Sequence, residues 1–329
     1  MEKKQDNLLE ISDLTVRYNT DDAVVHAVNN FSLNLARGEA RGLVGETGAG
    51  KTTLALSILR LLPERVGQVA GGSIVYDGQE LLKLPEAEML PLRGKRISMI
   101  FQDPMTSLNP TQTVGDQILE VLNLHFPEMT RDEKNKRVDE MMTLVGIPPE
   151  RKRSFPHEFS GGMKQRIVIA MALVAEPELL LADEPTTALD VTIQAQILEL
   201  MKQLREKFNT AVMLITHDLG VVAQFCDSVS VVYAGRVVEF GPVETVFQRK
   251  ENHPYTAGLF NCIPNLQDDQ PRLRPIPGRM ADPRVEYPGC CFADRCEYAT
   301  EQCRTEAPTM HVCGSHGIMC HRYAQKEEF

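Results

Sequence analysis

Apolar positions along the chain switch between the spacing of a strand and the spacing of a helix. Residues 8–18 and 24–35 alternate apolar and polar side chains, which predicts two half-buried strands. Short apolar runs predict further strands at residues 40–44, 72–77, 97–101, 179–182, 211–215, 228–233 and 236–239. Helical spacing predicts helices at residues 50–62, 117–124, 131–145, 191–208 and 218–226. Because strands and helices alternate, we predict an α/β fold with a mostly parallel sheet covered on both faces.

The character of this pattern changes twice along the chain. From residue 104 to about residue 173 it is helical, which predicts a helical subdomain. After residue 250 prolines become frequent and the periodicity fades, which is typical of an appended segment. We therefore divide the chain into a main domain, residues 1–250, and a C-terminal extension, residues 251–329.

Composition narrows the class of protein. Of 329 residues, 43% are hydrophobic and 24% are charged, with a formal net charge of −10, which argues against nucleic acid as the main partner. No run approaches the roughly 18 apolar residues of a membrane span. The charged N-terminal residues lead to no apolar core, so we expect no secretory signal. We expect a cytosolic chain, whose membrane role, if it has one, comes through a partner.

A glycine-rich segment follows the apolar run at residues 40–44. It reads G-E-T-G-A-G-K-T and fits the G-x-x-x-x-G-K-[ST] pattern of a P-loop, with a strand before it and a helix after it. Glycines let backbone N–H groups approach a polyphosphate, and the following helix points its N-terminus at the phosphates. Lys51 would reach the β and γ phosphates, and Thr52 would offer its hydroxyl to Mg²⁺. The candidate ATP-binding residues in this segment are Gly45, Glu46, Thr47, Gly48, Ala49, Gly50, Lys51, Thr52 and Thr53.

Two adjacent carboxylates, Asp183 and Glu184, end the apolar run at residues 179–182. Buried carboxylates are costly unless they are paired or bind a cation, and the carboxyl ends of parallel strands face the ligand crevice. Asp183 would hold Mg²⁺, and Glu184 would orient and deprotonate the attacking water. By itself such a pair is often a helix cap, but a P-loop in the same chain favours the catalytic interpretation.

The segment at residues 159–166, F-S-G-G-M-K-Q-R, resembles the signature sequence of ABC ATPases. Phe159 and Met163 replace the usual Leu and Gln, a variant that resembles the peptide-importer branch. Other family positions follow in order: Gln102 resembles the Q-loop glutamine, Asp190 ends a D-loop-like stretch, and His217 resembles the switch histidine. Tyr18 stands where these ATPases stack an aromatic ring on adenine. Each also has a structural alternative: a helix cap at Ser160, Gly161 and Gly162, a surface Gln102, a capping or core His217, and a half-buried Tyr18.

The resemblance is to ATP-binding subunits of the dipeptide, oligopeptide and nickel importers. It implies a RecA-like P-loop ATPase core with an antiparallel β subdomain, a helical subdomain and a Cys-rich C-terminal extension. It implies ATP hydrolysis that powers peptide uptake, with Glu184, His217 and Gln102 as catalytic residues and with Mg²⁺ held by Thr52, Gln102 and Asp183. Nickel or another small solute, or a soluble ABC ATPase not coupled to transport, remain alternatives.

The family's dimer also implies partners. Each ATP would lie between one subunit's P-loop and the other's Ser160, Gly161, Gly162 and Asp190, with a sister ATPase as the second subunit. Two transmembrane permeases would receive the motion, and an extracytoplasmic binding protein would act indirectly. The chain would then be peripheral, on the cytoplasmic face of the membrane.

Cysteines gather at the end of the chain. Cys226 and Cys262 stand alone, whereas six lie in the last 40 residues, which in a reducing cytosol favours metal binding over disulfides. Residues 253–259 and the later cysteines resemble the extension of the peptide-importer ATPases. The family-type positions are Cys290, Cys296, Cys303 and Cys320, with Cys291 and Cys313 as extras. Wide spacings and the resemblance favour a [4Fe–4S] cluster, and zinc or free thiols are the alternatives.

Overall fold

The computed structural model describes residues 6–187, 189–248, 251–262 and 275–324. The chain forms two compact units, each assembled from segments far apart in sequence. The first unit comprises Met1–Leu8, Leu35–Ala40 and Tyr76–Ile215, and the second comprises Leu9–Asn34, Arg41–Val75 and Thr216–Phe329. The P-loop segment therefore belongs to the second unit, and the Asp183–Glu184 pair to the first.

A parallel sheet forms the core of the first unit. Its strands are β6 (Ile97–Ile100), β7 (Leu179–Asp183) and β8 (Ala211–Thr216), with β7 in the middle. Every side chain of β7 and β8 is buried, as expected for parallel strands that are covered on both faces. The predicted apolar runs at 179–182 and 211–215 thus correspond to real strands, each one residue longer.

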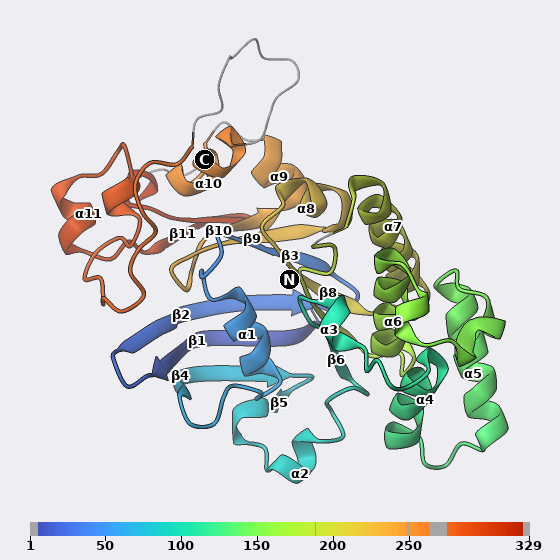
Figure 1. The fold of residues 1–329 in the computed structure, drawn as a ribbon. Coiled ribbons are helices and arrows are strands. Elements are labelled where there is room, and N and C mark those ends of the chain that lie inside the picture. The colour runs from blue at the N-terminus through green and yellow to red at the C-terminus, as the bar shows by residue number, and fades with distance from the viewer. Residues whose placement is uncertain (1–5, 188, 249–250, 263–274, 325–329) are drawn as a thin grey trace. The chain divides into compact units, whose positions relative to one another are not determined.

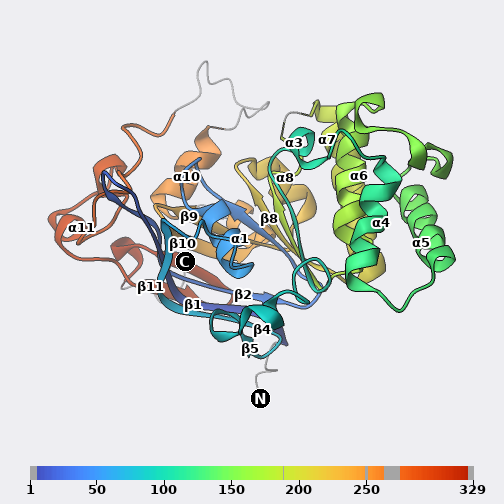
Figure 2. The same ribbon diagram turned by 60° about the horizontal axis from the view of Figure 1, so that its bottom comes forward.

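Helices make up most of the rest of the first unit. The longer ones are α4 (Val114–His125), α5 (Arg131–Leu144), α6 (Gly161–Leu173) and α7 (Val191–Phe208). The first three lie side by side in both views (Figure 1, Figure 2). Thr130 begins α5 with a capping box, in which Glu133 bonds back to the Thr130 backbone. The short elements are β5 (Gln79–Glu80), η1 (Leu81–Lys83), α2 (Glu86–Met89), α3 (Pro104–Ser107), η2 (Pro149–Arg153) and η3 (Pro156–Glu158).

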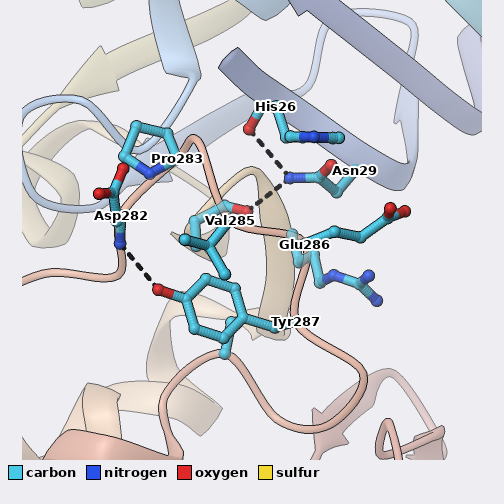
Figure 3. Close-up of a pocket in the computed structure, with 10 residues that line it drawn as sticks. His26, Asn29, Asp282, Pro283, Val285, Glu286 and Tyr287 are labelled. Atoms are coloured by element: carbon cyan, nitrogen blue, oxygen red, sulfur yellow. Dashed lines mark hydrogen bonds between the residues drawn. The ribbon is translucent and has the colours of Figure 1, made fainter. Parts of the chain in front are cut away.

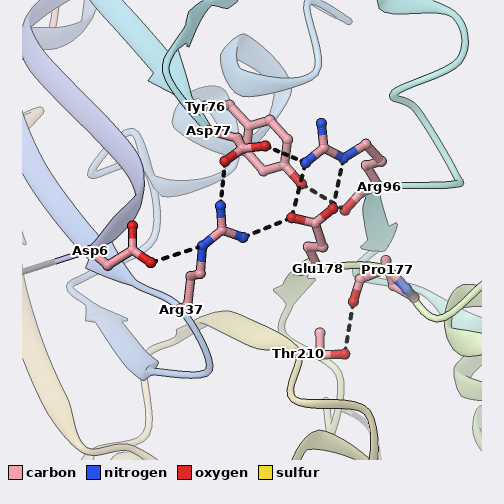
Figure 4. A network of polar contacts seen from close by, with 8 residues as sticks. All are labelled: Asp6, Arg37, Tyr76, Asp77, Arg96, Pro177, Glu178 and Thr210. Carbon is pink, nitrogen blue, oxygen red and sulfur yellow. Dashed lines mark hydrogen bonds and ion pairs between the residues drawn. The ribbon is translucent and has the colours of Figure 1, made fainter.

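A network of ion pairs ties together the segments that lead into β6 and β7 (Figure 4). Arg96 donates to both oxygens of Glu178, at 2.7 and 3.0 Å, and to Asp77 at 2.6 Å. Arg37 also pairs with both carboxylates. Hydrogen bonds from Arg96 lower the pKa of Glu178 and of Asp77 below their ordinary values. Because several charges share partners, this network stabilises more than isolated surface pairs would.

The second unit contains a mixed sheet. Strand β3 (Ala40–Val44) pairs in parallel with β9 (Ser228–Tyr233), and β9 pairs antiparallel with β10 (Arg236–Pro242). The C-terminal extension adds two strands, because β12 (His316–Met319) pairs antiparallel with β10 and with β11 (Met310–Cys313). The sequence pattern predicted no strand after residue 250, so this hairpin is a correction. Its signal was the Gly-Ser pair at 314–315 between two short β-type runs.

Three further strands of the second unit lie in the order β2-β1-β4, with bounds Asn7–Asn19 for β1, Val24–Ala36 for β2 and Gly67–Tyr76 for β4. Its helices are α1 (Lys51–Ile58), α8 (Leu219–Phe225), α9 (Val243–Gln248), α10 (Pro254–Asn261), η4 (Ala293–Arg295), α11 (Glu301–Thr305) and η5 (His321–Tyr323). Helix α1 is shorter than the predicted 50–62, because Arg60 takes a left-handed conformation with φ 53°. Within the described ranges, no helix is long and apolar enough to span a bilayer.

A buried carboxylate anchors the C-terminal extension. Glu239 of β10 is fully buried and accepts hydrogen bonds from the Asn252 side chain (3.0 Å), the His253 backbone (2.9 Å) and His316 Nε2 (2.8 Å). His253 in turn begins α10, because its Nδ1 accepts the Tyr255 N–H at 3.1 Å. Burial lowers the pKa of His253 from 6.5 to about 4, although Glu239 opposes the shift.

This buried histidine makes the stability of the fold sensitive to acid. Because the folded pKa of His253 is depressed, the unfolded chain binds more protons between pH 6.5 and about 4. The contribution of neutral His253 to the free energy of unfolding is complete above pH 6.5 and falls by about 3 kcal/mol as the pH drops to 4. We expect urea unfolding at several pH values to show this loss. His253→Asn keeps an acceptor for Tyr255 but does not titrate, so its pH dependence should be shallower; parallel curves for the two proteins would contradict the prediction.

Candidate functional site

The P-loop backbone can follow its path because glycines occupy its tightest points. Gly50 precedes α1 with φ 95°, and a Cβ there would lie 2.1 Å from the Ala27 carbonyl oxygen. A Cβ on Gly45 would lie 2.2 Å from the Val232 carbonyl oxygen. Neither position therefore accepts a side chain, and the loop forms the bare backbone cradle that a polyphosphate requires.

Lys51 carries a buried ammonium group in this cradle. Its side chain is 6% exposed, and Nζ donates to the carbonyl oxygens of Gly45 (2.7 Å) and Glu46 (3.0 Å). The charged ammonium group therefore lies within the P-loop, close to its backbone carbonyls. Thr52 is exposed at the start of α1, where its hydroxyl can serve as an oxygen ligand. The half-buried Tyr18 meets Thr53, with its hydroxyl 3.1 Å from Thr53 Oγ1. The donor set of the loop fits a magnesium nucleotide.

A turn between β9 and β10 supports the loop. The Gly235 N–H donates to the Ala49 carbonyl at 3.0 Å, and the Asn29 N–H donates to the Gly235 carbonyl at 2.9 Å. The Asn29 side chain also bonds to the carbonyls of Ala234 and His26 (Figure 3). His26, Asn29 and Ala234 border a pocket of about 40 Å³ whose other side includes Tyr287. Its volume suits water and is far too small for a nucleotide.

Two residues of the C-terminal extension contact the P-loop, and motif reasoning missed both. The Glu46 N–H donates to the Tyr255 hydroxyl at 3.0 Å, and Arg295 forms an ion pair with the Glu46 carboxylate at 2.6 Å. They are separated from Glu46 by 209 and 249 residues, so no local pattern links them. The one usable signal was an acidic residue inside a loop that should bind an anion.

In the first unit, two of the predicted catalytic residues contact each other. Glu184 follows β7, is 9% exposed and has φ 47°. Its Oε2 accepts from Gln102 Nε2 at 3.1 Å and from Thr187 Oγ1 at 2.9 Å. The sequence analysis did not single out Thr187. Asp183, at the last position of β7, is 2% exposed. A carboxylate that accepts hydrogen bonds from neutral donors keeps its negative charge and can itself take up a proton.

The signature segment and the D-loop position both lie at helix starts. Ser160 is the N-cap of α6, where its hydroxyl accepts the Met163 N–H at 3.4 Å. Asp190 is the N-cap of α7 and accepts the Ile193 N–H at 3.0 Å. Both adopt the capping geometry, which leaves the N-terminus of α6 able to receive an anion as well. Residue 188 of the D-loop-like stretch lies outside the described residues.

His217 belongs to the second unit and is exposed directly after β8. The next residue, Asp218, begins α8, since its carboxylate accepts the N–H groups of Gly220 (2.7 Å) and Val221 (3.3 Å). Because its side chain is exposed, His217 is not a core histidine.

The iron–sulfur expectation is wrong. In the part of the chain that the structure describes, no group of three or more His, Cys, Asp or Glu side chains is placed to hold a metal ion. The expected ligands Cys290, Cys296, Cys303 and Cys320 line a cavity of about 20 Å³, which has room for about one water molecule.

Burial also determines the protonation of these thiols. Burial raises the pKa of Cys290 to about 12 and raises those of Cys296 and Cys320 as well. The extra Cys291 has its pKa raised to about 11 for the same reason. Without a metal ion these thiols are neutral and pack as small apolar groups.

Comparison with known proteins gives consistent matches along the chain. The family model of the ABC transporter matches residues 28–187, and that of the oligopeptide/dipeptide transporter C-terminal region matches residues 238–303. A probable peptide ABC transporter ATP-binding protein of Sinorhizobium fredii is 48% identical over 97% of this chain and 96% of its own length. The oligopeptide transport ATP-binding protein OppD of Salmonella typhimurium is 49% identical over 92% of this chain and 89% of its own length.

Solved structures agree on the fold over about three quarters of the chain. The cbiO1 protein from Clostridium perfringens, part of the ABC transporter complex cbiONQ, has a TM-score of 0.65 and 31% identity, covering 75% of this chain and 93% of its own. A dimeric ATP-binding cassette in a post-hydrolysis state, bound to ADP and Pi, has a TM-score of 0.64 and 27% identity. It covers 71% of this chain and 98% of its own. The predicted P-loop ATPase fold is confirmed, and its sheets are mixed.

Proposed function

This chain belongs to the ABC transporter ATP-binding proteins of the oligopeptide/dipeptide type, and we propose that it couples ATP hydrolysis to the uptake of peptides through membrane permeases. It is an ATPase, the energising subunit of a peptide importer. The observation that carries this conclusion is the near-full-length identity of 46% to 49% with relatives named for oligopeptide transport. The bare backbone cradle at the P-loop supports the nucleotide part independently.

ATP binding begins at the P-loop. The backbone of residues 45–50 surrounds the phosphates, and Lys51 exchanges its carbonyl partners for phosphate oxygens. Thr52 and Asp183 are the proposed oxygen ligands of Mg²⁺, joined by Gln102. A metal ion held by these residues would neutralise charge on the phosphates. Tyr18 is proposed to stack on adenine, and its hydrogen bond to Thr53 would hold the ring beside the loop.

We assign the role of general base in hydrolysis to Glu184, a carboxylate of the first unit. Glu184 orients the attacking water and takes its proton, while Thr187 and Gln102 hold the carboxylate in place. His217 is proposed to contact the γ phosphate. Gln102 bonds to Glu184 and begins the segment that leads to α3. It can therefore transmit a conformational change at the phosphate to a partner protein bound to the helical subdomain.

A second cassette completes the proposed site. Ser160, Gly161 and Gly162 at the start of α6 would contact the phosphates held by a sister ATPase, and Asp190 would contact the partner's loop. The dimeric relative bound to ADP and Pi supports such an arrangement. We further propose two transmembrane permeases, an extracytoplasmic binding protein that acts indirectly, and a peripheral position on the cytoplasmic face.

Co-expression tests this proposal. The purified chain alone should be mainly monomeric with weak ATPase activity, because each nucleotide lacks the partner's hydroxyl and N–H donors. Assembly with the sister ATPase and both permeases should raise turnover per chain by about tenfold or more. The measurement is phosphate release together with the mass of the particle in solution. A lone chain that forms a stable ATP-bound homodimer and hydrolyses as fast as the full complex would contradict both the heterodimer and the coupling.

A further inference from the structure

Arg295 occupies a buried position beside the P-loop. It ends η4 in the C-terminal extension and is 7% exposed. Its guanidinium donates to both oxygens of Glu46, at 2.6 Å from Nη1 and 3.0 Å from Nη2. Nε donates to the Pro277 carbonyl at 2.9 Å. This two-point geometry fixes the direction of the Glu46 side chain as well as neutralising its charge.

An aromatic cluster holds the guanidinium in place. The Arg295 Cζ lies 5.7 Å from the Tyr233 ring centre and 5.9 Å from that of Phe292. Tyr233 and Phe292 meet edge to face at 5.2 Å, and Tyr255 packs on both, at 4.7 and 5.4 Å. Arginine on aromatic faces is a favourable arrangement, and the rigid rings leave the side chain little freedom.

The same cluster also holds the backbone of Glu46. The Tyr255 hydroxyl accepts the Glu46 N–H at 3.0 Å, and Tyr255 is fully buried. Burial raises the pKa of Tyr255 far above its ordinary value, so the phenol stays neutral. Both the main chain and the side chain of this P-loop residue are therefore fixed by residues of the C-terminal extension.

Glu46 is an unfavourable residue for a loop that binds a polyanion. A carboxylate there repels phosphate, and the repulsion is strong because the surroundings are partly shielded from water: the Glu46 side chain is 32% exposed. We propose that Arg295 is a positioning residue for ATP binding, which neutralises Glu46 and holds its carboxylate away from the phosphate site. This inference rests on the proposed ATP site at the P-loop and gives the C-terminal extension a direct part in it.

A double-mutant cycle that neutralises each charge tests the proposal on the full chain, with equilibrium titration by a fluorescent ATP analogue in the presence of Mg²⁺. Arg295→Gln leaves Glu46 unpaired, and we expect the Kd to rise about tenfold. Adding Glu46→Gln to Arg295→Gln removes the repelling charge, so the double variant should bind more tightly than Arg295→Gln alone. Raising NaCl from about 0.05 M to about 0.5 M should shrink the defect of the single variant, because salt screens the repulsion.

Controls separate this effect from packing and from the ATP site itself. Arg304→Gln breaks an exposed pair with Asp294 in the same extension and should bind ATP as the wild type does. Arg295→Lys, which keeps the charge, should lose less affinity than Arg295→Gln and serves if the latter fails to fold. Arg295→Gln with wild-type affinity, or a double variant no better than the single one, overturns the positioning role. Unchanged affinity in Lys51→Ala would instead overturn the ATP site.

Discussion

Glu184→Gln is expected to keep ATP binding and to lower phosphate release by the assembled transporter about a hundredfold or more. The amide has nearly the shape of the carboxylate, and its oxygen can still accept from Gln102 and Thr187, so the local structure should persist. It cannot take the proton of the attacking water, and hydrolysis should therefore stop while the nucleotide stays bound. Phosphate release and ATP titration on the same preparation separate the two steps.

The matched control is Glu206→Gln, on an exposed position of α7. It removes the same charge from the first unit without approaching β7, so both binding and turnover should match the wild type. If Glu184→Gln instead turns over ATP at the wild-type rate, Glu184 is not the base and the catalytic assignment falls.

Lys51→Ala should lose ATP affinity by about a hundredfold, because it removes the charge-assisted hydrogen bonds to the phosphates. Without ligand, the ammonium group bonds to the carbonyls of Gly45 and Glu46, so the substitution also frees two loop carbonyls. Thermal unfolding should show whether the loop tolerates this. Equilibrium titration measures the affinity.

Lys136→Ala provides the comparison for charge, since Lys136 is an exposed residue of α5 whose side chain is 80% accessible. Its affinity for ATP should equal that of the wild type. An unchanged affinity in Lys51→Ala would mean that residues 45–52 do not bind the nucleotide, whatever their motif.

Local patterns predicted the parts of the fold that depend on local forces. The runs that became β7 and β8 are apolar throughout because parallel strands are covered on both sides, and they appear within one residue of their predicted ends. The hairpin of β11 and β12 was missed because its four-residue strands are too short to show a period of two. It forms through pairing with β10, a partner about 80 residues earlier in the chain.

The candidate site likewise contains residues that local motifs located and residues that only folding brings together. Motif spacing located Lys51, Asp183, Glu184 and Ser160, because each belongs to a continuous segment with its own chemistry. Their functional roles stay predictions. Arg295 and Tyr255 could not be found in that way, since their relation to Glu46 exists only after folding. The cysteine spacing misled for a related reason: spacing does not show where side chains lie after folding, and among the described residues no group of three or more His, Cys, Asp or Glu side chains is placed to hold a metal ion.

The ion pair between Glu46 and Arg295 has a consequence for the order of events during synthesis. The P-loop leaves the ribosome 249 residues before its arginine partner. At about 5–20 residues per second, this is a delay of roughly 12–50 seconds. Once residue 215 has been made, the segments of the first unit are complete, whereas the second unit still lacks β10, β12 and the aromatic cluster around Arg295. A nascent or prematurely terminated chain therefore carries a P-loop whose acidic residue has no counter-charge. We expect nucleotide binding to stabilise the fold fully only after the segment that contains Arg295 has been made.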